Sequence, residues 1–345
     1  MKSGRSILVV MASFALIAST ESAPTGKPQP PVGTKEKPQI AERGPHHRVW
    51  EWIEYEPTYD GKMAERRHSY QELATGLHFK NERGEWEESK EEIEILPNDA
   101  GAIAAKGQHK VIFPPEIKAG LIELQTPDGQ WLRSRVWGLA YFDAATGESV
   151  LLAEVKECEG QLVGNNVVVY PDAFTDFGAD LRYTYTRAGF EQDIVLRENP
   201  PGPEAFGLNP KQTRLQVLTE FVEAPPPTKV RHQTGDLTDE TLGFGGTGIG
   251  MGKAFSVDAD GQNGGDIPVA KQWLRPVEGP LEGRDFLIEE VRYEKVAEQL
   301  KKLPAADKYQ GASLERRGRG ENVLAGLRSL LPKRYVKAAP DATRR

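Results

Sequence analysis

The stretch Ala179-Asp-Leu-Arg-Tyr-Thr-Tyr-Thr186-Arg-Ala-Gly189-Phe-Glu-Gln-Asp-Ile-Val-Leu-Arg197 holds two alternating runs on either side of a short turn. In the first run the large residues Leu181, Tyr183 and Tyr185 alternate with polar ones. Side chains alternate between the two faces of a strand, so these three fall on one face. The stretch therefore predicts an antiparallel hairpin with one buried face and one wet face.

The same pattern recurs between Ser69 and Glu223 in roughly ten short segments separated by turns that contain Gly or Asp. The other predicted hairpins are Gly76–Lys80 with Glu85–Ser89, Leu121–Thr126 with Gln130–Val136, and Leu139–Phe142 with Ser149–Lys156. No amphipathic helix interrupts the series, which argues against alternating strand and helix units. We expect a mainly β protein, an antiparallel β-sandwich with Gly- and Asp-rich excursions and one or two short C-terminal helices.

Composition divides the rest of the chain. The predicted parts are a signal peptide over 1–23, a flexible leader over 24–45, the sandwich over 46–223, a Pro-, Gly- and Asp-rich excursion over 224–266, closing strands and a helix over 267–303, and a basic, partly disordered tail over 304–345. The run Glu223-Ala-Pro-Pro-Pro-Thr228 ends the strand pattern because proline has no amide to donate. Helical spacing over Val291–Leu303 stops at Pro304, and a second short helix is expected over Asn322–Leu331.

The N-terminus predicts export. Lys2 and Arg5 precede an apolar run of 12 residues, Ile7 to Ala18, and then small residues up to Ala23. This arrangement is typical of a secretory signal peptide. The run is shorter than the roughly 20 apolar residues that span a bilayer, and no later segment reaches that length. We therefore expect a secreted, periplasmic or cell-surface protein with no transmembrane segment after signal removal.

Charge and cysteine content narrow the function classes. The net charge of −7 hides a basic C-terminus, where residues 295–345 hold 13 Lys or Arg against 5 Asp or Glu. The acidic remainder should repel polyanions, so nucleic acid is not an expected partner. Cys158 is the only cysteine, so stability must come from burial rather than from internal disulfides. We interpret Cys158 as a small buried or edge residue rather than a nucleophile.

One Gly-rich segment suggests a cation site. Closely spaced carboxylates and amides can wrap a hard cation such as Ca²⁺ with oxygen ligands. The candidate ligands are Asp258, Asp260, Asn263 and Asp266. Asn263 stands where an EF-hand loop needs its turn glycine, so an ordinary acidic turn explains the segment as well, and no cofactor is required.

Motifs of known catalytic sites are missing. The run Gly243-Phe-Gly-Gly-Thr-Gly248 formally matches a dinucleotide fingerprint, but it lacks the preceding strand and following helix that a phosphate loop needs. The six histidines form no zinc pattern, and no serine-hydrolase elbow is present. Two glycosidase carboxylates would leave no motif, so an enzyme stays open, although the sequence favours a non-catalytic protein.

Aromatic residues provide a second kind of candidate. Trp86, Trp131, Trp137 and Trp273 would bind sugar rings by stacking if they were exposed on a shared face. Trp50, Trp52, Tyr55 and Tyr59 lie close together after the leader and are interpreted as an edge strand or clasp.

Two runs carry a family resemblance. The segment Val169-Tyr-Pro-Asp-Ala-Phe174, continued through the hairpin to Leu196, resembles a hairpin in the N-terminal β region of wall-associated and RHS-type bacterial surface proteins. The wider stretch Ser69–Leu303 is similar to an uncharacterised family of exported bacterial proteins, with Gln108-His-Lys-Val-Ile-Phe113 and Asp236-Leu-Thr-Asp-Glu-Thr-Leu242 among the shared runs. The resemblance implies an extracellular setting and supplies no catalytic residue.

Three functions follow in order of preference. The first is a non-catalytic exported structural or adhesive module at the cell surface, with a cell-envelope polymer or polysaccharide as partner. The second is a carbohydrate-binding module, and the third is a hydrolase of an extracellular polymer. The oligomeric state is left open by the sequence.

Overall fold

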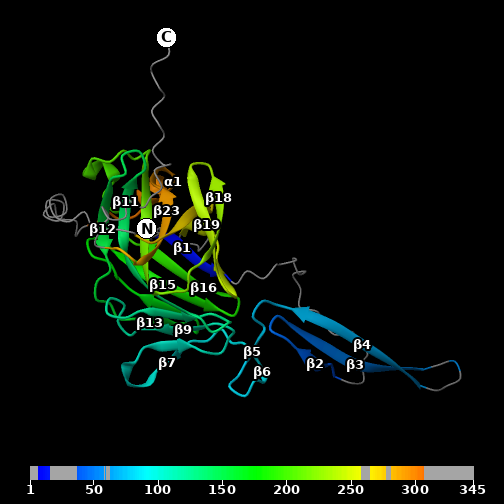
Figure 1. Ribbon diagram of the computed structural model, residues 1–345. Helices are drawn as coiled ribbons and strands as arrows, with labels where there is room; N and C mark the ends of the chain where they lie inside the picture. The colour runs from blue at the N-terminus through cyan, green and yellow to red at the C-terminus, as the bar shows by residue number, and fades with distance from the viewer. Residues whose placement is uncertain are drawn as a thin grey trace, which may run out of the picture.

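The structure is a computed structural model that describes residues 7–15, 37–57, 59, 63–257, 265–276 and 281–306. Its described part is mainly β, as the sequence predicts, and every pairing between its named strands is antiparallel. Two parts are distinguished in Figure 1: a packed body, and an arm of three strands that projects from its base. Among the described residues, no helix is long and apolar enough to cross a bilayer.

Eighteen of the described strands form one continuous sheet that folds over itself into two layers. The first layer contains β1 (Ile7–Ala15), β13 (Gln161–Val163), β14 (Val167–Tyr170), β15 (Ala179–Thr186), β16 (Gly189–Leu196), β18 (Thr228–Thr234), β19 (Leu237–Phe244), β20 (Thr247–Ile249) and β21 (Gly252–Val257). The second contains β7 (Glu94–Ile95), β8 (Ala102–Ala104), β9 (Lys110–Phe113), β10 (Ile122–Gln125), β11 (Trp131–Asp143), β12 (Ser149–Glu154), β17 (Thr213–Glu223) and β23 (Asp285–Arg292). Strand β22 (Ile267–Leu274) joins the layers, because its start pairs with β21 and its end with β23.

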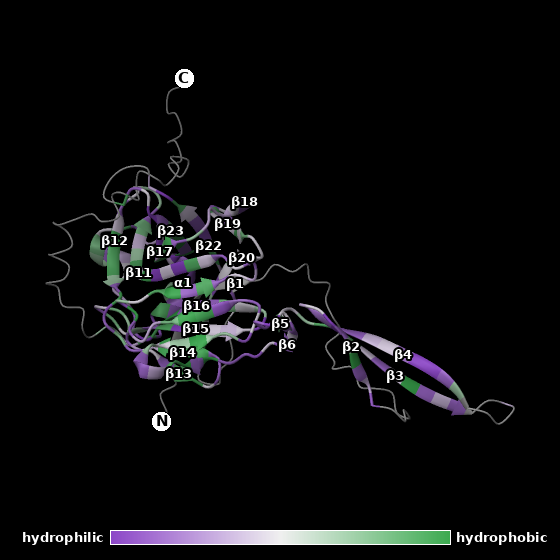
Figure 2. Ribbon diagram, turned by 60° about the horizontal axis from the view of Figure 1, so that its bottom comes forward, coloured by the Kyte–Doolittle hydropathy of each residue, from purple (hydrophilic) through white to green (hydrophobic). Residues whose placement is uncertain are grey.

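The two layers pack face to face, which is a sandwich-like arrangement. On β15, Leu181, Tyr183 and Tyr185 are fully buried, whereas the alternate residues are partly exposed. The ring of Tyr183 lies 6.1 Å from that of Phe113 on β9, in the other layer. Figure 2 shows apolar residues of the first layer on β14 and β16. The hairpin predicted over Ala179–Arg197 therefore contributes large side chains to the core between the layers.

The predicted hairpins are confirmed. Strands β15 and β16 pair over eight residues, β10 pairs with the start of β11, and β12 pairs with the end of β11. A small separate sheet of β5 (His78–Lys80) and β6 (Trp86–Glu88) is the hairpin expected around Gly84. The helices are short: α1 (Tyr293–Leu300) and the 3-10 turns η1 (Pro97–Asp99) and η2 (Pro203–Phe206). The helix expected over Asn322–Leu331 lies outside the described residues.

The excursion predicted over 224–266 is largely sheet instead. It contains β18 to β21, and some of its apolar residues, Leu242, Phe244 and Ile249 among them, are buried in the main core, whereas Val230 is exposed. The hairpin of β18 and β19 also reaches β22 through side chains, because the carboxylates of Asp239 and Glu240 accept the backbone N–H groups of Lys271 and Trp273. The low apolar content of this segment led to the wrong prediction, because carboxylates here accept hydrogen bonds from the backbone N–H groups at a strand edge.

The N-terminal apolar run is also part of the sheet. Strand β1 lies between β16 on one side and β20 with β21 on the other, in the middle of the first layer. The leader predicted over 24–45 likewise contains a strand, β2 (Gln39–Arg43). The prediction of a removable signal peptide therefore falls on a segment that includes a strand of the first layer.

Candidate functional site

The arm is the part of the molecule that carries the candidate site. It consists of β2, β3 (His47–Pro57) and β4 (Met63–Leu73), in the order β2-β3-β4. Strands β3 and β4 pair over all eleven of their residues, whereas β2 reaches only as far as Glu51. At about 3.4 Å per residue the hairpin is roughly 37 Å long. Beyond Glu51 the arm is a two-stranded ribbon, a form that is marginally stable alone in water.

A short neck joins the arm to the body. The backbone N–H of Ala74 donates to the carbonyl of His46, and the ring Nδ1 of buried His78 lies 2.9 Å from the carbonyl oxygen of Gly44. The amide of Gln108 donates to the carbonyls of Pro45 and His78, at 2.6 and 3.0 Å. These bonds fix the direction in which the arm leaves the body.

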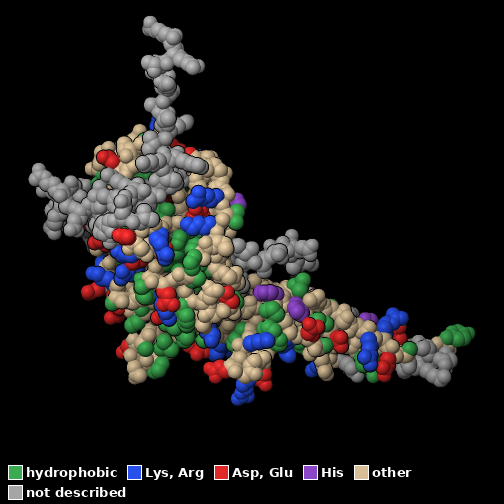
Figure 3. Space-filling model, in the orientation of Figure 1, with side chains coloured by type: hydrophobic (Ala, Val, Ile, Leu, Met, Phe, Trp, Pro, Cys, Tyr) green, Lys and Arg blue, Asp and Glu red, His purple; other side chains and the backbone are tan. Residues whose placement is uncertain are grey.

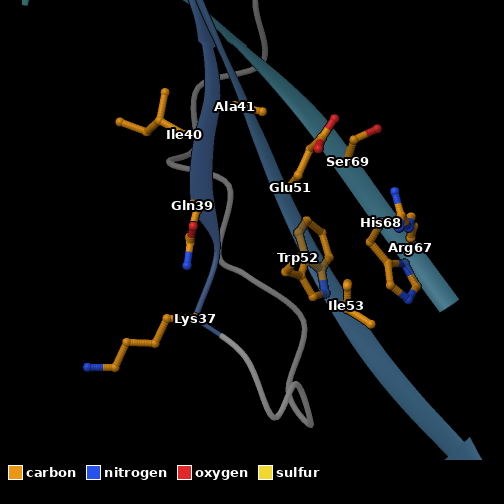
Figure 4. A pocket seen from close by; sticks show the side chains of 10 residues that line it. All are labelled: Lys37, Gln39, Ile40, Ala41, Glu51, Trp52, Ile53, Arg67, His68 and Ser69. Carbon is orange, nitrogen blue, oxygen red and sulfur yellow. The ribbon is translucent and has the colours of Figure 1, made fainter. Parts of the chain in front are cut away.

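A hollow of about 390 Å³ lies along the three strands of the arm (Figure 4). Its volume falls within the range of about 300–1,000 Å³ that small-molecule sites occupy. The residues that line it are Lys37, Gln39, Ile40, Ala41, Glu51, Trp52, Ile53, Arg67, His68 and Ser69. The hollow thus combines apolar and aromatic surface with both signs of charge and with amide and hydroxyl groups.

The aromatic wall of the hollow is built by strand register. Trp52 and His68 stand opposite one another on β3 and β4, and their rings stack at 5.0 Å with an angle of 10° between the planes. His68 Nε2 lies 3.1 Å from a carboxylate oxygen of Glu54. Trp52 is 6% exposed, and its indole N–H is buried with no hydrogen-bond partner among the described residues. A buried donor without a partner costs free energy.

A second group of side chains stiffens the base of the arm. Glu72 accepts hydrogen bonds from Arg48 Nε at 2.6 Å, Arg48 Nη2 at 3.1 Å and the indole N–H of Trp50 at 3.1 Å. These hydrogen bonds, that of Arg48 first, hold the pKa of the Glu72 carboxyl below its ordinary value. The guanidinium of Arg48 also lies 5.0 Å from the Trp50 ring centroid. The base of the arm is therefore held in one arrangement by charge-assisted bonds.

The four tryptophans proposed as sugar platforms are not brought together. Trp86 lies on β6 under Lys80, at 5.1 Å, and Trp131 lies on β11 under Arg133, at 4.8 Å. Trp137 packs further along β11 against Phe286 and Arg284. Trp273 is 5% exposed, with its N–H donated to Asp285, so its ring has no free face for a sugar. Trp131 and Trp137 share a strand but stand about 20 Å apart.

The proposed calcium ligands fall mostly outside the described residues. Asp258, Asp260 and Asn263 all lie there. Asp266 is described, and its carboxylate accepts a hydrogen bond from Lys253 Nζ at 2.7 Å across the β21–β22 pair. In the described ranges no group of three or more His, Cys, Asp or Glu side chains is arranged to hold a metal ion.

Other reactive groups in the described part serve structure. Burial raises the pKa of the Cys158 thiol to about 11, and its sulfur lies 2.8 Å from the carbonyl oxygen of Pro171. A thiol held protonated in this way is a poor nucleophile. Inside the body Lys271 Nζ donates to Asp239 at 2.9 Å, and Glu289 stands opposite Lys271 in the sheet. Burial raises the pKa of Glu289 to about 8. Lys271, Asp239 and Glu289 are buried in the body, whereas Cys158 is partly exposed.

Sequence reasoning missed the site at Trp52 and His68. The alternation of Trp50 and Trp52 signals a strand with an aromatic face, but only the pairing with β4 shows which residues meet it. Comparison of the chain with family models, with curated proteins and with solved structures gives no match. The site is therefore interpreted on its own geometry.

Proposed function

We propose that the protein is a non-catalytic exported adhesive module that binds a cell-envelope polymer through the hollow of its arm. The observation that carries this proposal is the arm itself: a ribbon that projects from the body and bears a hollow lined by aromatic, charged and amide side chains. Export is supported by the sequence pattern at the N-terminus.

The chemistry of the hollow fits a polar polymer such as a polysaccharide. Lys37, Glu51 and Arg67 offer charges of both signs, and Gln39 and Ser69 offer neutral donors and acceptors. Sugars present hydroxyl groups to such residues and apolar ring faces to aromatic ones. The mixture of charges disfavours a uniformly anionic or cationic partner, because each would meet a like charge.

The arm also has a physical reason to bind. Among the described residues its distal half consists of two strands, and Tyr59, between β3 and β4, is fully exposed. A partner laid along the ribbon would supply the packing that an isolated hairpin lacks. Figure 3 shows charged side chains of both signs along the arm, with few apolar ones.

Retention on isolated cell envelopes tests the proposal. Arg67→Glu reverses one charge in the hollow, and we expect at least about a fivefold loss of retention, which corresponds to about 1 kcal/mol. The matched control is Arg66→Glu, the same change one residue away on a side chain that does not line the hollow and pairs with Glu56 instead. Retention should then stay within about twofold.

A third form separates the arm from the basic tail. The chain without residues 304–345 should be retained like the whole chain if the arm carries binding. Loss of retention on removal of the tail, together with normal retention of Arg67→Glu, would assign binding to the tail and overturn the proposal.

The sugar-platform alternative has less support from the geometry, because its four indoles lie on three strands and one is buried. The alternative of a polymer hydrolase requires two carboxyl groups about 5–10 Å apart around a cleft. Among the described residues that line the hollow on the arm, one carries a carboxylate, Glu51.

A further inference from the structure

Strand β1 lies between two neighbours in the first layer, and we call the place that it occupies the slot. Residues Leu8 to Ala15 pair with β16 from Leu196 back to Gly189. On the other side, Ile7 to Met11 pair with β21, and Phe14 and Ala15 pair with β20. The first layer therefore depends on this one strand to connect β16 with β21.

The strand in this slot belongs to the segment that the sequence predicts to be removed on export. Removal of residues 1–23 would leave the backbone N–H and C=O groups of β16 and β21 unpaired in the middle of a sheet. Unpaired strand edges are templates for another strand, and proteins use them for recognition by strand addition.

On both faces of the sheet, buried residues beside the slot favour an apolar occupant. The position held by Val10 stands between Ile194 and Ala254, both buried residues of the main core. The next position, held by Val9, stands between Val195 and Phe255, which form a separate buried cluster on the other face of the sheet. A strand buried on both faces is a near-continuous apolar run rather than an alternating one.

The middle and one end of the slot are more polar. The position of Met11 stands between Lys253 and the fully buried Asp193, one of whose carboxylate oxygens has no hydrogen-bond partner among the described residues. The position of Ser13 stands opposite Glu191, which is partly exposed. A cationic residue is therefore acceptable at the Ser13 position and not at the Val9 position.

We infer that the exported protein accepts, in the slot between β16 and β21, an extended apolar segment of about nine residues from a second protein. This inference rests on the proposed function, because it requires export and removal of residues 1–23. The second protein is recognised by backbone pairing on both sides and by an apolar run of the kind Ile-Leu-Val-Val-Met-Ala-Ser-Phe-Ala. The body would thus assemble with a partner protein, while the arm holds the envelope polymer.

The test uses the protein secreted from its full-length precursor and a peptide of residues 7–15 with a lysine tail for solubility. Intact mass first shows whether residues 1–23 are removed. We expect removal, saturable binding of one peptide per chain, and a Tm that rises with peptide concentration as for any ligand of the folded state.

Peptide variants test the slot without altering the protein. Val9→Lys places a charge between Val195 and Phe255 and should weaken binding at least tenfold, an effect of about 1.4 kcal/mol or more. Val10→Pro removes one backbone donor from the ladder and should weaken it by about the same factor. Ser13→Lys is the matched control and should bind within about threefold of the parent peptide.

Each result decides a different point. Secreted protein that retains residues 1–23 would show β1 to be a permanent strand and would overturn both the slot and the processing on which it rests. Secreted protein that lacks them but binds no peptide would show that β16 and β21 close on each other, which overturns the slot and leaves envelope binding by the arm intact. Equal binding of Val9→Lys and Ser13→Lys would also contradict the inference.

Discussion

The body and the arm are built from the same kind of strand but are stabilised in different ways. In the body two layers enclose large rings such as Tyr183, Phe113 and Phe190, all almost completely buried. In the arm a single layer is held by cross-strand pairs and by the bonds around Glu72, with most side chains of β4 exposed. Burial gives cooperative stability, whereas a single layer gives accessible surface. Under the proposed function, the body is the scaffold and the arm is the contact surface.

The largest expected effect is in the body core. Tyr183→Ala removes a ring that stacks on Phe190 at 5.6 Å and should lower the free energy of unfolding by about 3–5 kcal/mol. Its hydroxyl is buried with no hydrogen-bond partner among the described residues, so Tyr183→Phe should leave stability equal or higher. Urea denaturation measures both. A loss above about 1 kcal/mol in Tyr183→Phe would contradict the assignment of an unpaired hydroxyl.

The next effect is a pH dependence of the body. Because burial raises the pKa of Glu289 to about 8 in the folded state, the folded protein binds its proton more tightly than the unfolded chain does. Stability from this group is complete below the ordinary carboxyl pKa, declines as the pH rises toward 8 and levels off above it. Glu289→Gln should remove this decline and raise the free energy of unfolding at pH 9 by more than about 1.4 kcal/mol, the value of one pKa unit.

Urea unfolding at pH 5, 7 and 9 checks this prediction. Lys271 and Asp239 neutralise each other's charge without Glu289. The neutral glutamine of Glu289→Gln should therefore fit at this buried position without destabilising the fold. Parallel pH profiles for the variant and the parent chain would show that Glu289 is ionised at neutral pH and would contradict the account.

A smaller and local effect is expected in the arm. Glu72→Gln weakens the bonds to Arg48 and Trp50 and should reduce the local stability of β3 and β4 by about 0.5–1 kcal/mol. Since the pKa of Glu72 is lowered in the folded state, its contribution is present above the ordinary carboxyl pKa and is lost as the pH falls through the lowered value. Hydrogen exchange of the arm amides measures it.

The control for this prediction is Glu65→Gln, the same change at an exposed position of β4. It should alter exchange by less than Glu72→Gln does, and the body amides should be unchanged in both variants. Faster exchange throughout the body of Glu72→Gln would show that the two regions unfold together. That result would contradict the separate stabilisation of body and arm.

The sequence predicted the body better than the arm, for reasons visible in particular residues. The period of two at Leu181, Tyr183 and Tyr185 is a local signal, and burial confirms it. Strand β19 was missed because its contact with β22 is made by the carboxylates of Asp239 and Glu240, residue types that are usually found at the surface.

The candidate site required information that no local pattern holds. The stacking of Trp52 on His68 follows from the register of β3 against β4, set along the whole hairpin. Likewise, the sequence does not distinguish a tryptophan whose ring is buried, such as Trp273, from one whose ring is partly exposed, such as Trp131. Strand propensity is local, whereas exposure depends on what packs above a residue.

The most direct test of the proposed division between scaffold and contact surface is hydrogen exchange of the chain with and without solubilised cell-envelope polymer. We predict slower exchange across residues 37–57 and 63–73, greatest near Trp52 and His68, with the amides of β11, β17 and β23 unchanged. Protection confined to the body, with arm amides that exchange as fast as in the free protein, would contradict the account.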